Sequence, residues 1–267
     1  MPLGMLIFLT LLHSHAPATD DPKVPILIKG AVAPLPYSRG ERHEWEWTHD
    51  GIPVGKTTIQ LLAPKEDQPG WTLDARLRWS RQGRSIDLRQ LTSFLSPSLK
   101  PISTRKERRI EALGAGSRRT VVACEVIDSE ARIVVQNPAE GTQVDQILPF
   151  ADGTVLLENQ CFEHWLLISA LLYRAEGDGT EIAAKRSFSA LIPSEYRLLQ
   201  LKLSQDRHEK AGKDTLIRWN VTCSDFEAKI WTGPGGTLER YRQGPVEIRR
   251  IPTVKSVPSD KQEKNRR

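Results

Sequence analysis

The sequence predicts a mainly β protein, in which a strongly curved antiparallel sheet or incomplete β-barrel wraps one central helix. Apolar and polar residues alternate in most segments between residues 42 and 242, which is the pattern of half-buried strands. Short polar or Gly/Pro-containing breaks separate several of these segments. A single apolar segment at residues 159–175 instead has helical spacing. Roughly ten strands in one stretch favour a barrel, half-barrel or sandwich.

The chain begins with a segment that predicts export. Residues 3–12 form an apolar run of ten, followed by Ala16-Pro17-Ala18. The run is shorter than the about 20 residues that span a bilayer, but it fits the core of a signal peptide with a small-x-small cleavage site. We therefore expect a signal peptide at residues 1–18 and a periplasmic or extracellular protein. An N-terminal anchor is the alternative, since no Lys or Arg precedes the run.

Prolines mark the next segment as an extended leader. Pro22, Pro25, Pro34 and Pro36 occur within residues 19–40, and prolines at this density oppose a helix. We expect a single β-rich domain to follow, over residues 41–252.

The first predicted strand, residues 42–50, carries two histidines and two tryptophans on one face. Because side chains alternate along a strand, His43, Trp45, Trp47 and His49 share that face. The two histidines lie roughly 20 Å apart at about 3.3 Å per residue, so they do not bind one metal ion. The tryptophans either pack in the core or line an apolar ligand cavity. Asp50-Gly51 then predicts a tight hairpin turn.

Further strands follow the same pattern. In residues 71–79 the apolar face holds Trp71, Leu73, Ala75, Leu77 and Trp79, and the other face is polar, as in an antiparallel sheet with one solvated side. The remaining predicted strands are residues 53–62, 84–92, 118–127, 131–136, 197–204, 215–223, 226–232 and 237–242. A Gly-Pro-Gly-Gly turn at residues 233–236 joins the last two.

Residues 159–175 predict a buried helix. Asn159 is a suitable N-cap and Gly177 a suitable stop. The segment is apolar over most of its circumference, so we expect it to pack against the sheet. Cys161 and His164 are three residues apart, but a catalytic pair would need an orienting group and an oxyanion site, and neither is recognisable.

The positive charge of the chain is concentrated at its C-terminal end. Of the net charge of +5, residues 253–267 carry +3, from five basic and two acidic side chains. We expect a disordered basic tail whose membrane contact is at most peripheral. The near-neutral remainder argues against a nucleic-acid partner. The basic run Arg105–Arg109 lacks interleaved aromatics, which favours a solvated strand or loop.

Three cysteines leave two alternatives open. Cys124 and Cys223 both lie in predicted strands, and a disulfide between them is a tentative prediction. The favoured alternative is that Cys124, Cys161 and Cys223 are all buried as small apolar residues.

No motif of a known reaction occurs. The sequence lacks G-x-S-x-G, the P-loop, H-E-x-x-H and C-x-x-C. We predict no cofactor, no metal site and no catalytic residues, and we lean against an enzyme. A site assembled from distant strands is the remaining enzymatic alternative.

The order of elements resembles that of a known family. The segment D-G-I-P-V-G-K-T at residues 50–57 follows an aromatic strand, and I-W-T-G-P-G-G-T-L-E-R-Y at residues 230–241 closes the domain. The chain thereby resembles a family of exported bacterial proteins of unknown function. Their fold is similar to the incompletely closed sheets of the lipoprotein-carrier proteins of the bacterial envelope. The resemblance implies fold and compartment, and it brings no catalytic residues.

These observations favour a non-enzymatic protein that binds a lipophilic small molecule on the concave face of its sheet. The candidate cavity-wall residues are Trp45, Trp47, Trp71, Trp79, Trp165 and Trp219. A structural or protein-interaction module of the cell envelope, with a solid core, is the alternative.

Overall fold

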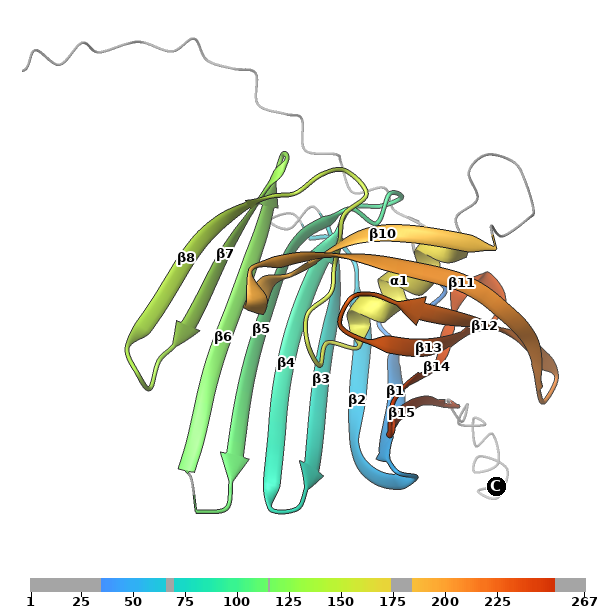
Figure 1. Ribbon diagram of the computed structural model, residues 1–267, viewed down its shortest axis with the longest axis horizontal. Helices are drawn as coiled ribbons and strands as arrows, with labels where there is room; N and C mark the ends of the chain where they lie inside the picture. The colour runs from blue at the N-terminus through green and yellow to red at the C-terminus, as the bar shows by residue number, and fades with distance from the viewer. Residues whose placement is uncertain (1–34, 66–69, 115, 174–183, 253–267) are drawn as a thin grey trace, which may run out of the picture.

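One curved sheet of 15 strands forms the body of the molecule (Figure 1). The structure is a computed structural model that describes residues 35–65, 70–114, 116–173 and 184–252. The predicted signal peptide, most of the predicted leader and the predicted basic tail lie outside these residues. Within them, no helix is long and apolar enough to cross a membrane. The mainly β fold wrapping one α-helix confirms the predicted fold class.

The strands fall into two groups, the two arms of the sheet, and each arm is built mostly of successive antiparallel hairpins. The first group is β1 (Arg42–His49), β2 (Ile52–Leu62), β3 (Trp71–Arg81), β4 (Arg84–Phe94), β5 (Pro101–Ala112), β6 (Gly116–Ile127), β7 (Glu130–Asn137) and β8 (Thr142–Pro149). The second group is β9 (Val155–Leu156), β10 (Lys185–Ile192), β11 (Arg197–Ala211), β12 (Asp214–Thr222), β13 (Glu227–Thr232), β14 (Leu238–Gln243) and β15 (Val246–Ile251).

The two groups join through the first and last strands. The sheet order runs from β8 down to β1, continues with β15 and ends at β9. All pairs are antiparallel except β9 with β10. The sheet is therefore continuous at β1–β15 and open between β8 and β9, which are neighbours in the sequence.

Period-two alternation placed the strands that have one buried face. In β1, His43, Trp45 and Trp47 are buried, as predicted, and the residues between them are not. Asp50 and Gly51 have φ angles of 51° and 77°, the left-handed pair that a two-residue hairpin requires. The strands β5, β8, β9, β10 and β15 were not among the predicted strands. The basic run Arg105–Arg109, for which a solvated strand or loop was expected, lies within β5.

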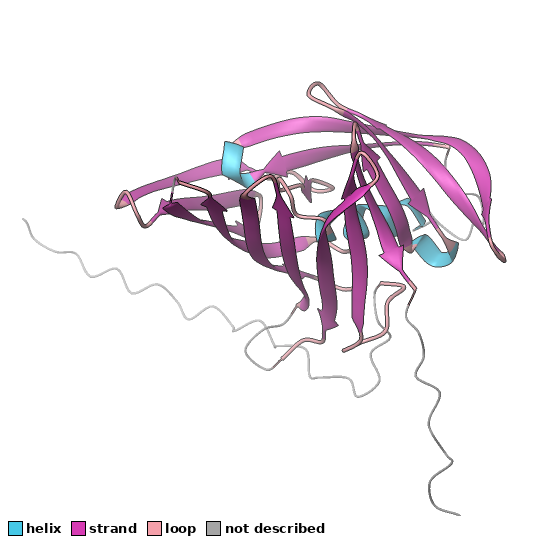
Figure 2. Ribbon diagram, turned by 90° about the horizontal axis from the view of Figure 1, so that it is seen from below, coloured by secondary structure: helices cyan, strands magenta, loops and turns pink. Residues whose placement is uncertain are grey.

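The helix α1 (Glu163–Tyr173) lies on the concave side of the sheet, between its two arms (Figure 2). Nine of its 11 residues are buried, which confirms the prediction of a buried helix. It begins four residues after Asn159, so Asn159 is not its N-cap. The short helix η2 (Pro234–Gly236) closes against it, since Ser169 Oγ donates to Gly236 O at 3.0 Å.

The last six residues of the predicted leader belong to the folded body. Leu35 and Tyr37 are buried, and the backbone N–H of Leu238 donates to Tyr37 Oη at 2.8 Å. The guanidinium of Arg250 lies 5.5 Å from the Tyr37 ring centre. Apolar side chains of the predicted leader, Leu35 and Tyr37, therefore complete the core.

The tentative disulfide is not formed, since all three cysteines are free thiols. Cys124 lies in a small apolar cluster with Ile133, Phe150 and Leu191, whereas Cys223 packs against the main core. The favoured alternative holds for Cys124 and Cys161, which are buried, and only partly for Cys223, which is half-exposed.

Candidate functional site

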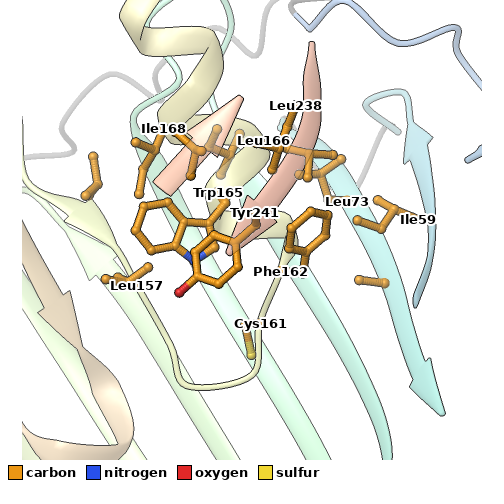
Figure 3. Packing of buried hydrophobic residues seen from close by; sticks show 14 of the residues in the cluster. Ile59, Leu73, Leu157, Cys161, Phe162, Trp165, Leu166, Ile168, Leu238 and Tyr241 are labelled. Atoms are coloured by element: carbon orange, nitrogen blue, oxygen red, sulfur yellow. The ribbon is translucent and has the colours of Figure 1, made fainter. Parts of the chain in front are cut away.

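Aromatic rings connect the helix to both arms of the sheet. Phe162, in the turn before α1, contacts Trp45 of β1 with ring centres 5.4 Å apart. Trp165 of α1 contacts Tyr241 of β14 at 5.2 Å and Phe226 at 6.3 Å. Figure 3 shows Phe162, Trp165 and Tyr241 facing one another above Cys161. The contacts of Phe162 with Trp45 and of Trp165 with Phe226 are edge-to-face, and that of Trp165 with Tyr241 is tilted. Contacts of this kind stabilise aromatic clusters, so the start of the helix is held between the two arms.

A cavity of about 910 Å³ opens beside this aromatic cluster. Its apolar lining comes from both arms of the sheet and from the helix start. These side chains are Trp47, Leu77, Trp79, Ile86, Leu157, Phe162, Trp165, Ile192, Phe226, Tyr241, Val246 and Ile248. The volume falls within the range of about 300–1,000 Å³ that is typical of small-molecule sites.

The six predicted wall residues divide into two sets. Trp47, Trp79 and Trp165 line the cavity. Trp45, Trp71 and Trp219 do not line it, and all three are buried in the core. The indole N–H of Trp45 donates to Leu238 O at 3.2 Å, and that of Trp219 donates to Thr232 Oγ1 at 3.0 Å.

A buried ion pair lies behind the cavity. Lys106 of β5 donates through Nζ to Glu158 Oε1 at 3.0 Å and to Asn159 O at 2.6 Å. The side chains of Lys106 and Glu158 are 4% and 0% exposed. Glu158 also accepts from the Ser194 hydroxyl at 2.6 Å, from the Ser194 N–H at 2.7 Å and from the Asn159 N–H at 2.9 Å. The charges are thus fully satisfied, and the pair ties β5 to the chain before α1 and to the short helix η1 (Pro193–Glu195).

His164 is a neutral structural residue. Its Nδ1 accepts the backbone N–H of Glu158 at 2.9 Å, so the ring proton is on Nε2. That nitrogen lies 3.0 Å from Gln90 Nε2 and 3.1 Å from Thr92 Oγ1. Of these two groups the hydroxyl oxygen is the one that can accept its proton. Burial lowers the pKa of His164 to about 3, because the charged ring would lose its hydration. Both ring nitrogens are therefore occupied, and His164 does not serve Cys161 as a base.

Glu163 and Cys161 are buried in their protonated forms. Burial raises the pKa of Glu163 to about 8, and its Oε1 has no hydrogen-bond partner. Burial also raises the pKa of Cys161 well above its ordinary value. The Cys161 thiol donates to Asn159 O at 3.4 Å. A protonated thiol is a poor nucleophile. Cys161 and His164 therefore lack the thiolate and the available base that a catalytic pair requires.

Three arginines line the cavity, and only one of them forms ion pairs within the described residues. Arg197 pairs with Glu195 at 2.6 Å and also with Asp225. Arg84 of β4 and Arg108 of β5 line the same cavity. In the part of the chain that the structure describes, neither forms a side-chain hydrogen bond or an ion pair. Among the described residues, no group of three His, Cys, Asp or Glu could hold a metal ion.

Sequence reasoning missed two of these polar features. Lys106 and Arg108 alternate with the exposed Arg105 and Arg109 in one strand. Because all five residues of the basic run are polar, the pattern alone does not show which of them face inward. Glu158 lies outside any periodic segment, and its partner Ser194 follows 36 residues later. No local pattern indicated that pair.

Comparisons with known proteins support the fold. Neither a family model nor a curated protein matches the sequence. Among solved structures, the chain is similar to the β-barrel-like protein of domain of unknown function DUF1849 from Brucella abortus. The TM-score is 0.50 and the sequence identity 12%, over 78% of this chain and 93% of that chain. This likeness shows that the chain shares its β-barrel-like fold with a bacterial β-rich protein of unknown function.

Proposed function

We propose that this chain is an exported, non-enzymatic protein of the bacterial envelope that holds a lipophilic ligand on the concave side of its sheet. The cavity of about 910 Å³, whose lining includes aromatic and aliphatic side chains from both arms of the sheet and from the helix start, is the observation that carries this proposal. The apolar run at residues 3–12 supports export. The half-open fold supports the expected similarity to lipoprotein carriers, whose sheets are also incompletely closed.

The polar groups around the cavity support binding over catalysis. Glu158 and His164 are occupied by partners on the chain itself, and the thiol of Cys161 stays protonated. An acyl chain entering the cavity would replace water on apolar surface, which is worth about 25 cal/mol per Å² before the costs of binding.

A saturable uptake of lipid tests this proposal. The full chain is purified under native conditions, weighed by native mass spectrometry and extracted with solvent. It is then titrated with hexadecanoate while tryptophan emission is followed. We expect a co-purified or added lipophile at one per chain and a change in emission, because Trp47, Trp79 and Trp165 line the cavity.

Two variants identify the site of uptake. Trp79→Phe should reduce the emission change, whereas Trp231→Phe should preserve it, because Trp231 does not line the cavity and donates to Glu209 at 2.8 Å. An apo mass together with unchanged emission would contradict the proposal.

A protein-interaction role is the second candidate, and one observation favours it. Among the described residues, strand β8 is paired only with β7 and lies at an edge of the sheet. Its Val144 and Ile147 are 44% and 60% exposed. Exposed edges of this kind accept a further strand from another chain. This candidate would gain support if no lipophile binds.

A further inference from the structure

Two arginines project from the inner face of the sheet into the cavity without a partner. In β5, Thr104 and Lys106 are buried on the inner face, and Arg108 follows at the same period. In β4, Arg84 shares a face with the buried Ile86 and Leu88. Arg84 and Arg108 both line the cavity. Among the described residues, neither forms a side-chain hydrogen bond or an ion pair.

The register orders these cations along one wall. Arg108 is opposite Leu88, Ile86 is opposite Ile110, and Arg84 is opposite Ala112. Arg84 and Arg108 therefore lie roughly 13 Å apart along the strands, at about 3.3 Å per residue, with the two isoleucines between them. Arg108 is half-buried, and Arg84 is exposed near the β3–β4 turn. Along this wall, the cationic side chain of Arg108 is therefore followed by the apolar side chains of Ile86 and Ile110 and then by the cationic side chain of Arg84.

The carboxylates of the cavity already have cationic partners. Lys106 neutralises Glu158, and Arg197 holds both Glu195 and Asp225. An anion that enters the cavity would meet Arg108 as a cation free to bind it. A guanidinium that is partly removed from water binds carboxylate and phosphate groups strongly, because its planar fork donates two parallel hydrogen bonds.

We propose that the ligand is a single-chain amphiphile with an anionic head group, carboxylate or phosphate. Its head group is bound by Arg108. Its chain lies against four aromatic side chains that line the cavity, those of Trp47, Phe162, Trp165 and Tyr241. Arg84 attracts the head group at the outer end of the same wall. This inference rests on the proposed function and adds the class of ligand to it.

Ligands that share one chain length separate the head groups. Full-length protein is titrated with hexadecanoate, hexadecyl phosphate, hexadecanol and hexadecyltrimethylammonium, each below its critical micelle concentration. We expect both anions to bind at least tenfold more tightly than hexadecanol, and the cation to bind most weakly. A preference for one anion over the other distinguishes a fatty acid from a phosphate-bearing lipid, and either preference supports the proposal.

Charge-neutral variants test the role of each arginine. Arg108→Gln should remove most of the preference for anions and leave the affinity for hexadecanol within about twofold, and Arg84→Gln should have a smaller effect. Arg105→Gln is the matched control, since Arg105 is exposed on the opposite face of β5. This control should keep the full preference.

The possible failures are distinguishable. If hexadecanol and the anions bind equally well, or if Arg108→Gln and Arg105→Gln behave alike, the anionic head group is wrong and the lipophile site stands. If none of the four compounds binds, the proposed function fails as well.

Discussion

Two adjacent residues at the start of α1 have pKa values shifted in opposite directions by the same cause. Burial raises the pKa of Glu163 to about 8 and lowers that of His164 to about 3. Burial always favours the uncharged form, so both side chains are neutral at pH 7. The nearby charges that remain are those of Lys106 and Glu158, which neutralise each other.

These shifts predict that stability falls as pH rises from 6.5 to 8. In this interval folded Glu163 keeps a proton that the unfolded chain has released, so the folded state binds more protons and loses stability as pH rises. The slope is at most about 1.4 kcal/mol per pH unit. At lower pH, His164 acts in the opposite direction, because the unfolded chain binds a proton that the folded ring does not.

Urea unfolding at several pH values measures this effect. Glu163→Gln should flatten the fall in the free energy of unfolding between pH 6.5 and 8. Glu227→Gln is the control, because Glu227 is an exposed glutamate of β13 and should leave the fall unchanged. A wild-type stability that stays level or rises over this interval would show that Glu163 is ionised in the folded state.

The residues of the inner face were only partly predictable from the sequence. Alternation placed Trp45 and Trp47 correctly, because their neighbours in β1 are polar and mark the outer face. It did not place Lys106 and Arg108, since five successive polar residues show no contrast between the two faces. A buried lysine requires a buried carboxylate, and Glu158 is brought to it only by the tertiary fold.

At the scale of the elements, α1 depends on a close approach by η2. A Cβ atom at Gly236 would lie 3.1 Å from Ser169 O and 3.2 Å from Ala170 Cα, and Gly236 has a φ of +85°. The neighbouring Gly235 has a similar φ of +69°, but a Cβ there would meet only Pro36, at 3.6 Å. The two glycines thus share a backbone conformation and differ in the space around them.

This pair predicts different costs for two similar substitutions. Gly235→Ala should destabilise the fold by about 1 kcal/mol through the left-handed backbone alone. Gly236→Ala should cost about 1–3 kcal/mol more, because overpacking pushes α1 from the sheet. Urea denaturation of both variants gives the difference. Equal costs would mean that the helix is not held by this contact.

The elements that the sequence missed lack the pattern on which strand prediction depends. Strand β8 is exposed on both faces over most of its length. It therefore has no buried apolar face that would contrast with a polar one, and alternation does not identify it as a strand. Strand β9 has two residues and pairs in parallel with β10. By contrast, the predicted turn at residues 233–236 is present between β13 and β14, because Gly and Pro determine local geometry directly.

On the scale of the whole molecule, the two arms of the open sheet meet by packing. Ala131 and Ile133 of β7 share an apolar cluster with Leu156 of β9 and Leu191 of β10. Cys124 of β6 is completely buried in this cluster. The arms are hydrogen-bonded through β1 and β15, but their far ends, β8 and β9, are not neighbours in the described sheet, so side-chain contacts hold these ends together.

Thiol labelling therefore reports on the separation of the arms. In native protein treated with a maleimide, Cys223 should react first because it is half-exposed. Cys124 should react at least tenfold more slowly, since burial raises its pKa to about 12 and the thiolate is the reactive form. Peptide mass spectrometry gives the rates, and labelling in urea should make them similar. Equal native rates would show that the arms separate readily.

The pairing of the first strand with the last has a consequence for how the chain folds. Almost every strand pairs with its neighbour in sequence, but Thr48 of β1 pairs with Glu247 of β15 across a separation of 199 residues. The entropy lost in closing a loop grows with the logarithm of its length. Forming the β1–β15 pair therefore has the largest entropy cost of any strand pairing in the described sheet. Each half can form as a series of local hairpins, and the two halves are joined only when the last strand reaches the first.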